Sequence, residues 1–253
     1  MKIELKENKK LNLDIPSFTC DNSPLGEHLN KYEMLSHLNS YSFTCVIGRP
    51  GSGKTSLVIS FLTGKADKKV FRKVFNHVVV VMPSSSRNSL KKNIFKNHPS
   101  EKLYEELTYE TISTIYENLL ESSENKQKTL LILDDVGASM KNNEIQKLLR
   151  KIIYNRRHLK VHIICMLQSY ISIPKEVRKL ITNVFLFKPS KVEMQNFCEE
   201  LFETKKDKAI EIMNFVYDKP HEYLMLNVEN QKMYKGFDEV IIHDEEKEHL
   251  EKI

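Results

Sequence analysis

The stretch that decides the fold is GRPGSGKT, residues 48–55. It matches G-x-x-x-x-G-K-[ST], a pattern whose glycines let consecutive backbone N–H groups point inward at bound phosphates. In this pattern Lys54 places a positive charge on the β- and γ-phosphates, and Thr55 offers a hydroxyl to Mg²⁺. The following helix would aim its positive end at the same anion. The sequence therefore predicts an ATP site whose contacts come from Gly48, Arg49, Pro50, Gly51, Ser52, Gly53, Lys54, Thr55 and Ser56.

The residues around this loop predict an α/β fold. An apolar run at 42–48 leads into the loop, and a helical run at 55–63 leaves it. The other apolar, β-branched runs are short enough to be buried strands: 77–83, 129–135, 161–168 and 183–189. Charged segments with helical periodicity lie between them, at 103–122 and 142–158. This alternation is typical of a doubly wound or RecA-like parallel sheet. Together with the phosphate loop, it predicts a RecA-like P-loop (ASCE) ATPase with a mostly parallel central sheet flanked by helices.

The run TLLILDDV ends a predicted strand with two carboxylates, Asp134 and Asp135. Ligands of open α/β sheets bind at the carboxyl ends of the strands, which is where the phosphate loop also lies. We expect Asp134 to hold Mg²⁺ through water, and Asp135 to orient or deprotonate the attacking water. The alternative is an Asp-Asp pair that merely starts a turn.

Two more features could serve hydrolysis. Gln168 ends another apolar strand, where its amide could contact the γ-phosphate or the lytic water; alternatively, it is only a polar strand end. Arg150, Arg156 and Arg157 lie near the end of a predicted helix, with Arg150 and Arg157 seven residues apart and so on one helix face. Attraction to the helix dipole would explain this cluster. The alternative is that one of these arginines, with Arg157 favoured, is an arginine finger that acts on the γ-phosphate of a neighbouring subunit.

In this order, GRPGSGKT, LLILDD and NRRHLKVHIICMLQS resemble the FtsK–HerA superfamily of ring-forming ATPases, and most of all the poxvirus-type genome-packaging ATPases of large DNA viruses and virophages. The resemblance covers about residues 42–190 and implies that the Gln168 strand lies between the Walker A and Walker B strands. It also implies a homo-oligomeric ring of five or six subunits that threads double-stranded DNA. By position, Lys54, Thr55, Asp134, Asp135 and Gln168 match the family's active-site pattern, although Asp135 replaces the commoner Glu.

The segments outside this core carry weaker signals. We divide the chain into an N-terminal extension (1–40), the ATPase core (41–190), C-terminal helices with a hairpin packed on the core (191–243) and a charged tail (244–253). The extension contains a short predicted helix at 25–38. Residues 191–217 predict one or two helices, and a hairpin is expected to turn near Glu229–Asn230. The polar, basic segment 84–102 either contacts DNA or is an ordinary solvated loop and helix.

Composition excludes several classes of protein. The chain of 253 residues is 40% hydrophobic and 29% charged, with a formal net charge of +5, which fits a globular protein. No apolar run approaches the roughly 18 residues that a membrane span needs. The cysteines, which predict neither a disulfide nor a zinc site, are scattered at positions 20, 45, 165 and 198, with Cys45 and Cys165 inside apolar runs. We expect a protein of the host cytoplasm, a viral factory or the virion, not a secreted one.

Two main functions remain open at this point. The first is a motor that hydrolyses ATP to move duplex DNA without sequence specificity, with capsid or vertex proteins as further partners. The second is a P-loop ATPase for protein remodelling or virion assembly. An AAA-type module or a small-molecule kinase would predict arginines in a C-terminal lid, but the last arginine is Arg178. A GTPase would need N-K-x-D, which is absent.

Overall fold

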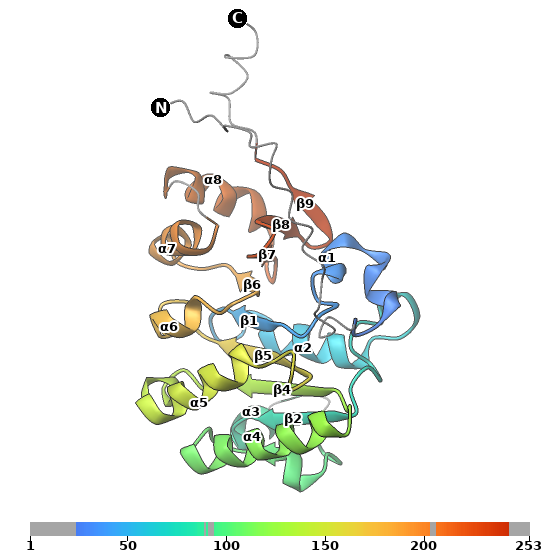
Figure 1. The fold of residues 1–253 in the computed structure, drawn as a ribbon. Coiled ribbons are helices and arrows are strands. Elements are labelled where there is room, and N and C mark those ends of the chain that lie inside the picture. The colour runs from blue at the N-terminus through green and yellow to red at the C-terminus, as the bar shows by residue number, and fades with distance from the viewer. Residues whose placement is uncertain (1–23, 89, 91–93, 203–205, 243–253) are drawn as a thin grey trace, which may run out of the picture.

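The computed structural model describes residues 24–242 except 89, 91–93 and 203–205. Within these residues, nine strands form one sheet in the order β3-β2-β4-β5-β1-β6-β7-β8-β9 (Figure 1). The strands are β1 Phe43–Ile47, β2 His77–Val81, β3 Leu103–Tyr104, β4 Thr129–Asp134, β5 Val161–Leu167, β6 Asn183–Phe187, β7 Tyr223–Asn227, β8 Lys232–Lys235 and β9 Asp238–Val240. The predicted α/β fold is confirmed.

The centre of the sheet is parallel and buried. Each of the five predicted apolar runs contains a strand, and β1, β4, β5 and β6 are buried along their whole length. Strand β5 pairs in parallel with both β1 and β4, with Cys45 opposite Cys165 and Leu133 also opposite Cys165. The Gln168 strand therefore lies between the phosphate-loop strand and the carboxylate strand, as the family resemblance implied.

Helices cover both faces of the sheet. They are α1 Glu33–Ser36, α2 Lys54–Thr63, α3 Ser84–Asn88, α4 Tyr109–Glu124, α5 Asn143–Tyr154, α6 Lys175–Arg178, α7 Lys191–Leu201 and α8 Lys206–Val216. One core joins the sheet to α4, α5, α7 and α8, whereas a second core joins its other face to α1 and α2 (Figure 1). The two apolar faces explain why the central strands read as continuous apolar runs.

Two helical predictions need correction. Residues 103–122 do not form one helix, because Leu103–Tyr104 pair with β2 and the helix begins only after Thr108, whose hydroxyl accepts from the Thr111 amide at 3.1 Å. Helix α5 ends at Tyr154, so Arg157 lies in the turn beyond it. The expectation that Arg150 and Arg157 share a helix face is therefore wrong.

The C-terminal part of the chain extends the central sheet. Strand β7 pairs antiparallel with β6, and β7 and β8 form the hairpin predicted around Glu229–Asn230. Strand β9, which the sequence analysis missed, pairs with β8. Residues 191–217 hold two helices, α7 and α8, and the charged tail at 244–253 lies outside the described residues.

The described part of the N-terminal extension packs against this hairpin. In place of the single helix expected at 25–38, the chain forms a 3-10 turn at Glu27–Lys31 and then α1, because Tyr32 between them is extended (φ −126°, ψ 137°). The His37 ring hydrogen-bonds the Tyr234 hydroxyl at 2.8 Å, and Glu33 forms an ion pair with Lys232. These contacts join the beginning of the described chain to the far side of the sheet.

Candidate functional site

The phosphate loop has the curled backbone that its sequence predicts. Gly51 (φ 76°) and Gly53 (φ 112°) adopt left-handed conformations that residues with side chains rarely take. Gly48 is held by its amide, which donates to the Leu167 carbonyl at 3.0 Å. A Cβ added at Gly48 would lie only 2.7 Å from both the Phe187 Cβ and the Ser52 Oγ. Residues 48–53 thus form one compact turn that leads into α2, which begins at Lys54.

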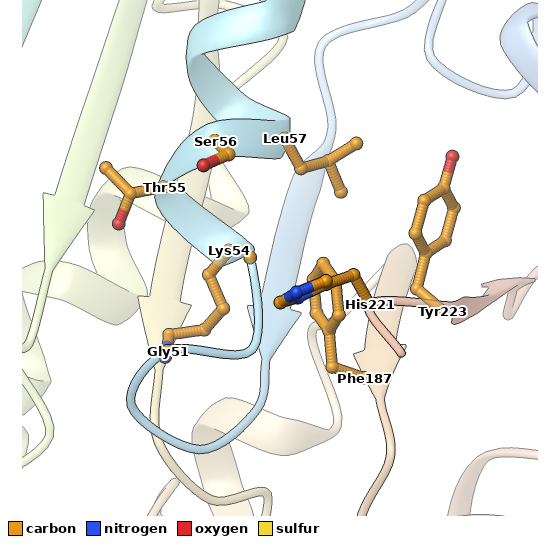
Figure 2. A pocket seen from close by; sticks show the side chains of 9 residues that line it. Gly51, Lys54, Thr55, Ser56, Leu57, Phe187, His221 and Tyr223 are labelled. Atoms are coloured by element: carbon orange, nitrogen blue, oxygen red, sulfur yellow. The ribbon is translucent and has the colours of Figure 1, made fainter. Parts of the chain in front are cut away.

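Lys54 starts α2 and turns back toward the loop (Figure 2). Its ammonium group donates to the Gly48 carbonyl at 2.6 Å and to the Arg49 carbonyl at 3.1 Å. Burial lowers the pKa of Lys54, while the nearby Asp134 and Asp135 carboxylates oppose that shift. The Ser52 hydroxyl is buried in the same loop without a hydrogen-bond partner. The loop therefore holds a positive charge and an unpaired donor, both suited to an anion.

Asp134 lies at the carboxyl end of β4 and is only 8% exposed. Burial raises its pKa to about 6, and the adjacent Asp135 charge adds to this shift, whereas Lys54 opposes it. Its carboxylate is thus incompletely neutralised by the surrounding protein. A bound cation would supply the missing charge, and a carboxylate with the Thr55 hydroxyl is a hard oxygen donor set that fits Mg²⁺.

The donors beyond this pair would have to come from outside the protein. In the described part of the chain, no group of three or more His, Cys, Asp or Glu side chains gathers as a metal site. Mg²⁺ usually keeps several waters and binds through one or two carboxylates plus substrate phosphates. A site made of Asp134 and Thr55 therefore fits a metal that arrives with a nucleotide.

Asp135 and Gln168 meet directly. The Gln168 Nε2 donates to the Asp135 Oδ1 at 3.0 Å, so the ends of β4 and β5 are joined by their side chains. Asp135 has φ 55°, an uncommon conformation for a residue with a side chain, and its amide donates to the Met166 carbonyl at 3.2 Å. Strained backbone of this kind clusters at functional sites. Both side chains are exposed at the edge of the sheet that carries the phosphate loop.

The arginine cluster lies elsewhere. Arg157 is exposed in the turn before β5, at the edge of the sheet opposite the phosphate loop. Arg156 is half-buried, and its guanidinium donates to the Tyr41 carbonyl at 2.9 Å and the Ile153 carbonyl at 3.1 Å. Arg150 is half-buried on α5. Arg156 and Arg157 thus lie in the turn before β5, away from the loop, and the bonds of Arg156 fix that turn.

A cavity of about 580 Å³ adjoins the loop on its other side. Beyond Lys54, Thr55, Ser56 and Leu57 on α2, its walls come from β6 and from the start of β7: Phe187, His221 and Tyr223 (Figure 2). The His221 Nδ1 donates to the Ser52 carbonyl at 3.0 Å. The sequence analysis missed these side chains because no local motif marks them. The only available signal was the predicted hairpin, whose first strand begins with Tyr223.

The basic segment 84–102 is partly described. Its Arg87 forms an ion pair with Glu105 at 3.0 Å, and Phe95 is buried. Lys91 and Lys92 lie outside the described residues. Helix α3 follows β2 at the same sheet edge as the phosphate loop, whereas the 3-10 turn at Ser100–Lys102 leads into β3, and its Lys102 contacts His77 at the start of β2.

Comparison with known proteins identifies the family. The model of the Poxvirus A32 protein family matches residues 30–252. The chain belongs to this family. A 153-residue stretch is 28% identical to the uncharacterized protein 015R of Frog virus 3 (isolate Goorha), covering 58% of this chain and 44% of that protein. The chain therefore matches less than half the length of this curated relative.

Solved structures agree on the fold of this A32-family chain. The genome packaging NTPase B204 of Sulfolobus turreted icosahedral virus 2, in complex with AMPPCP, is similar with a TM-score of 0.55 and 15% identity, over 76% of this chain and 95% of B204. The same protein in complex with ATP-gammaS gives a TM-score of 0.57 and 13% identity, over 76% and 95%. Across the residues that the structure describes, no helix has the length and apolarity of a membrane span.

Proposed function

We propose that this A32-family protein is an ATP-hydrolysing motor that translocates double-stranded DNA and packages a viral genome into a capsid. One observation carries the proposal: the phosphate loop, Asp134 and the Asp135–Gln168 pair converge at one edge of the sheet. Family membership and the likeness in fold to a genome packaging NTPase support the DNA-packaging part.

In the proposed reaction, the inward-facing amides of residues 48–53 hold the phosphates and Lys54 neutralises the β- and γ-phosphates. Lys54 must first exchange its bonds to the Gly48 and Arg49 carbonyls for phosphate oxygens. Asp135 accepts a proton from the attacking water or orients it, and Gln168 holds the Asp135 carboxylate through its amide. Mg²⁺, held by Thr55 and Asp134, would neutralise charge that develops on the phosphates.

An arginine from a neighbouring subunit would add a positive charge that stabilises the transition state of phosphoryl transfer. Because Arg157 is exposed at the opposite edge of the sheet, we infer that it acts on a neighbouring subunit in a ring of five or six chains. We favour Arg157 over its neighbour Arg156, whose guanidinium is already bonded to the Tyr41 and Ile153 carbonyls. The ring would thread duplex DNA, and capsid or vertex proteins would be its partners in the viral factory or virion.

The first test is ATP turnover by the purified protein with and without linear duplex DNA, at low and moderate salt. The Lys54→Ala variant is the blank. Because contacts to phosphate release counterions, we expect stimulation that falls as salt rises and that does not depend on DNA sequence. Turnover that is indifferent to DNA would contradict translocation and point to a protein-remodelling or assembly ATPase.

The second test concerns the ring. Arg157→Ala should retain ATP binding but lose hydrolysis by about 10³-fold or more, as expected for a missing arginine finger. Mixing it with Lys54→Ala subunits should restore some activity, because some interfaces then combine an intact Arg157 with an intact Lys54. Arg156→Ala should instead mainly destabilise the fold. Unchanged turnover in Arg157→Ala would remove this residue from the mechanism.

A further inference from the structure

The cavity beside the phosphate loop has walls that the hydrolytic mechanism does not use. Phe187 ends β6, and His221 and Tyr223 come from the chain that enters the antiparallel hairpin. His221 lies 169 residues after Ser52 in the sequence, yet it hydrogen-bonds the Ser52 carbonyl of the loop at 3.0 Å. The hairpin is therefore in direct contact with the phosphate site.

The order of the strands fixes how a nucleotide would lie. Asp134 and the Asp135–Gln168 pair are at the ends of β4 and β5, on one side of β1. The γ-phosphate must face these groups, because hydrolysis occurs there. The phosphate loop after β1 binds the middle of the triphosphate. The other end of the nucleotide then points toward β6 and β7, where the cavity lies.

The chemistry of this cavity suits a flat, aromatic group. Tyr223 is partly exposed, and its ring packs 5.6 Å from the Phe187 ring and 5.5 Å from the Phe185 ring, centroid to centroid. Leu57 on α2 lies on the opposite side of the cavity (Figure 2). Phe185 and Phe187 are buried and hold the Tyr223 ring from behind. An aromatic wall opposite an aliphatic side chain favours a base that enters edgewise and stacks.

His221 connects this wall to the phosphate loop. It has φ 64°, in the left-handed region, and its ring lies 3.6 Å from the position that a Gly53 Cβ would occupy. The imidazole thus borders both the loop and the cavity, between the places expected for the phosphates and for the base. Its bond to the Ser52 carbonyl sets the distance between the hairpin and the loop.

We propose that Tyr223, with His221 and Leu57, forms the subsite for the base of the bound nucleoside triphosphate, and that it recognises the base by stacking on the Tyr223 ring. This inference rests on the proposed ATP hydrolysis at the same loop. It gives the antiparallel hairpin a binding role, in addition to its role in closing the edge of the core.

The test compares two probes, ATP and inorganic tripolyphosphate, which has the phosphates but no base. Direct binding is measured calorimetrically on the full chain in Mg²⁺. Tyr223→Ala should weaken ATP about 5- to 150-fold, the range expected for loss of one base–aromatic stack, and leave tripolyphosphate unchanged. Tyr223→Phe keeps the ring and should bind ATP within about twofold of the wild type. Tyr154→Ala, an exposed tyrosine at the far end of α5, is the matched control.

Each other outcome is decisive. Equal weakening of ATP and tripolyphosphate in Tyr223→Ala would show that the change disturbs the phosphate loop, and would overturn the base subsite. So would unchanged ATP binding in Tyr223→Ala, or a Tyr223→Phe variant as weak as Tyr223→Ala. Failure of the wild type to bind ATP at all would instead overturn the proposed function, and this inference with it.

Discussion

The two sides of strand β1 are built from different chemistry. Toward β5 and β4, the strand ends carry the Gln168 amide and the Asp134 and Asp135 carboxylates. Asp134 is buried, and burial raises its pKa to about 6. Toward β6 and β7, they carry Phe187 and Tyr223, rings that pack against each other. The phosphate loop lies between a polar wall, to which we assign hydrolysis, and an aromatic wall, where His221 is bonded to the Ser52 carbonyl of the loop.

The difference follows the direction of the strands. The polar wall belongs to the parallel part of the sheet, in which consecutive strands bring their carboxyl ends to the same edge. The aromatic wall begins where β7 runs antiparallel to β6, so that the start of β7 lies beside the end of β6. Tyr223, the first residue of β7, is thus the register partner of Phe187. This pairing places the Tyr223 side chain beside the site. Substitutions on the two walls should therefore have separable effects.

Among substitutions in the loop and the two walls, the largest effect is expected in the loop. Lys54→Ala removes the charge that contacts the β- and γ-phosphates and should lower turnover by about 10²- to 10³-fold, as for loss of a preorganised transition-state donor. ATP and tripolyphosphate should both bind more weakly. Lys147→Ala, at an exposed position on α5, is the control. Turnover within tenfold of the wild type would contradict the role of Lys54.

The second-largest loss of turnover is expected from substitutions in the polar wall. Gln168→Ala and Asp135→Asn should each lower turnover by about 10- to 100-fold with little change in ATP affinity, in the range of general acid–base contributions. Because their side chains share one hydrogen bond of 3.0 Å, the double variant should lose less than the product of the two single losses. Gln146→Ala on α5 is the control, because it also removes a side-chain amide that donates a hydrogen bond, here to the Met140 carbonyl. Strictly multiplicative losses would show that the pair does not act as a unit.

A third prediction concerns the stability of the metal-free protein. The pKa of Asp134 is raised in the folded state to about 6, so its contribution to stability is complete below its unfolded pKa and is lost as the pH rises through 6. Asp134→Asn needs no ionisation. At pH 8 it should raise the free energy of unfolding by about 1–3 kcal/mol relative to the wild type, and the gain should be much smaller at pH 4.

Urea unfolding in EDTA at the two pH values measures this difference directly. The same variant should hydrolyse ATP poorly, because the amide is a weaker ligand for Mg²⁺ than the carboxylate. A gain that is equal at both pH values would mean that packing, and not the buried charge, sets the effect. A loss of stability at pH 8 would contradict the raised pKa of Asp134.

The smallest effect is expected behind the polar wall. Glu193 on α7 accepts from the Tyr170 amide at 3.1 Å and from the Ser169 hydroxyl, and so holds the two residues after Gln168. Glu193→Gln should lower kcat by about two- to tenfold and leave KM unchanged, because a neutral acceptor holds the chain less firmly than a charged one. Glu211→Gln on α8, at an exposed position, is the control. A change in KM alone would place the effect on the other wall.

The sequence could predict the parallel half of this molecule because its information is local. A glycine pattern, an apolar run and a terminal Asp134 identify a loop, a strand and its end without knowledge of distant contacts. The pairing of Gln168 with Asp135 needed only the expectation that their strands are neighbours, which came from the family resemblance. The phosphate loop and strands β1, β2, β4, β5 and β6 were therefore predictable in advance, whereas the short β3 was not.

The aromatic wall was not predictable, because no local sequence pattern marks its residues. Tyr223 and His221 acquire their positions only through the antiparallel pairing of β7 with β6, a contact between distant segments. Helix limits failed where local hydrogen bonds decide them, as at the Thr108 cap and at the extended Tyr32. The proposed role of Arg157 could not be predicted from local pattern either, because it depends on contact with a second chain.

Steady-state ATP hydrolysis by two variants, Gln168→Ala and Tyr223→Ala, tests the division between the walls most directly. The account predicts that Gln168→Ala lowers kcat by about tenfold or more with KM within about twofold of the wild type, whereas Tyr223→Ala raises KM by about tenfold and changes kcat little. A fall in kcat alone for both variants, or a rise in KM alone for both, would contradict the claim that hydrolysis and base binding lie on opposite sides of β1.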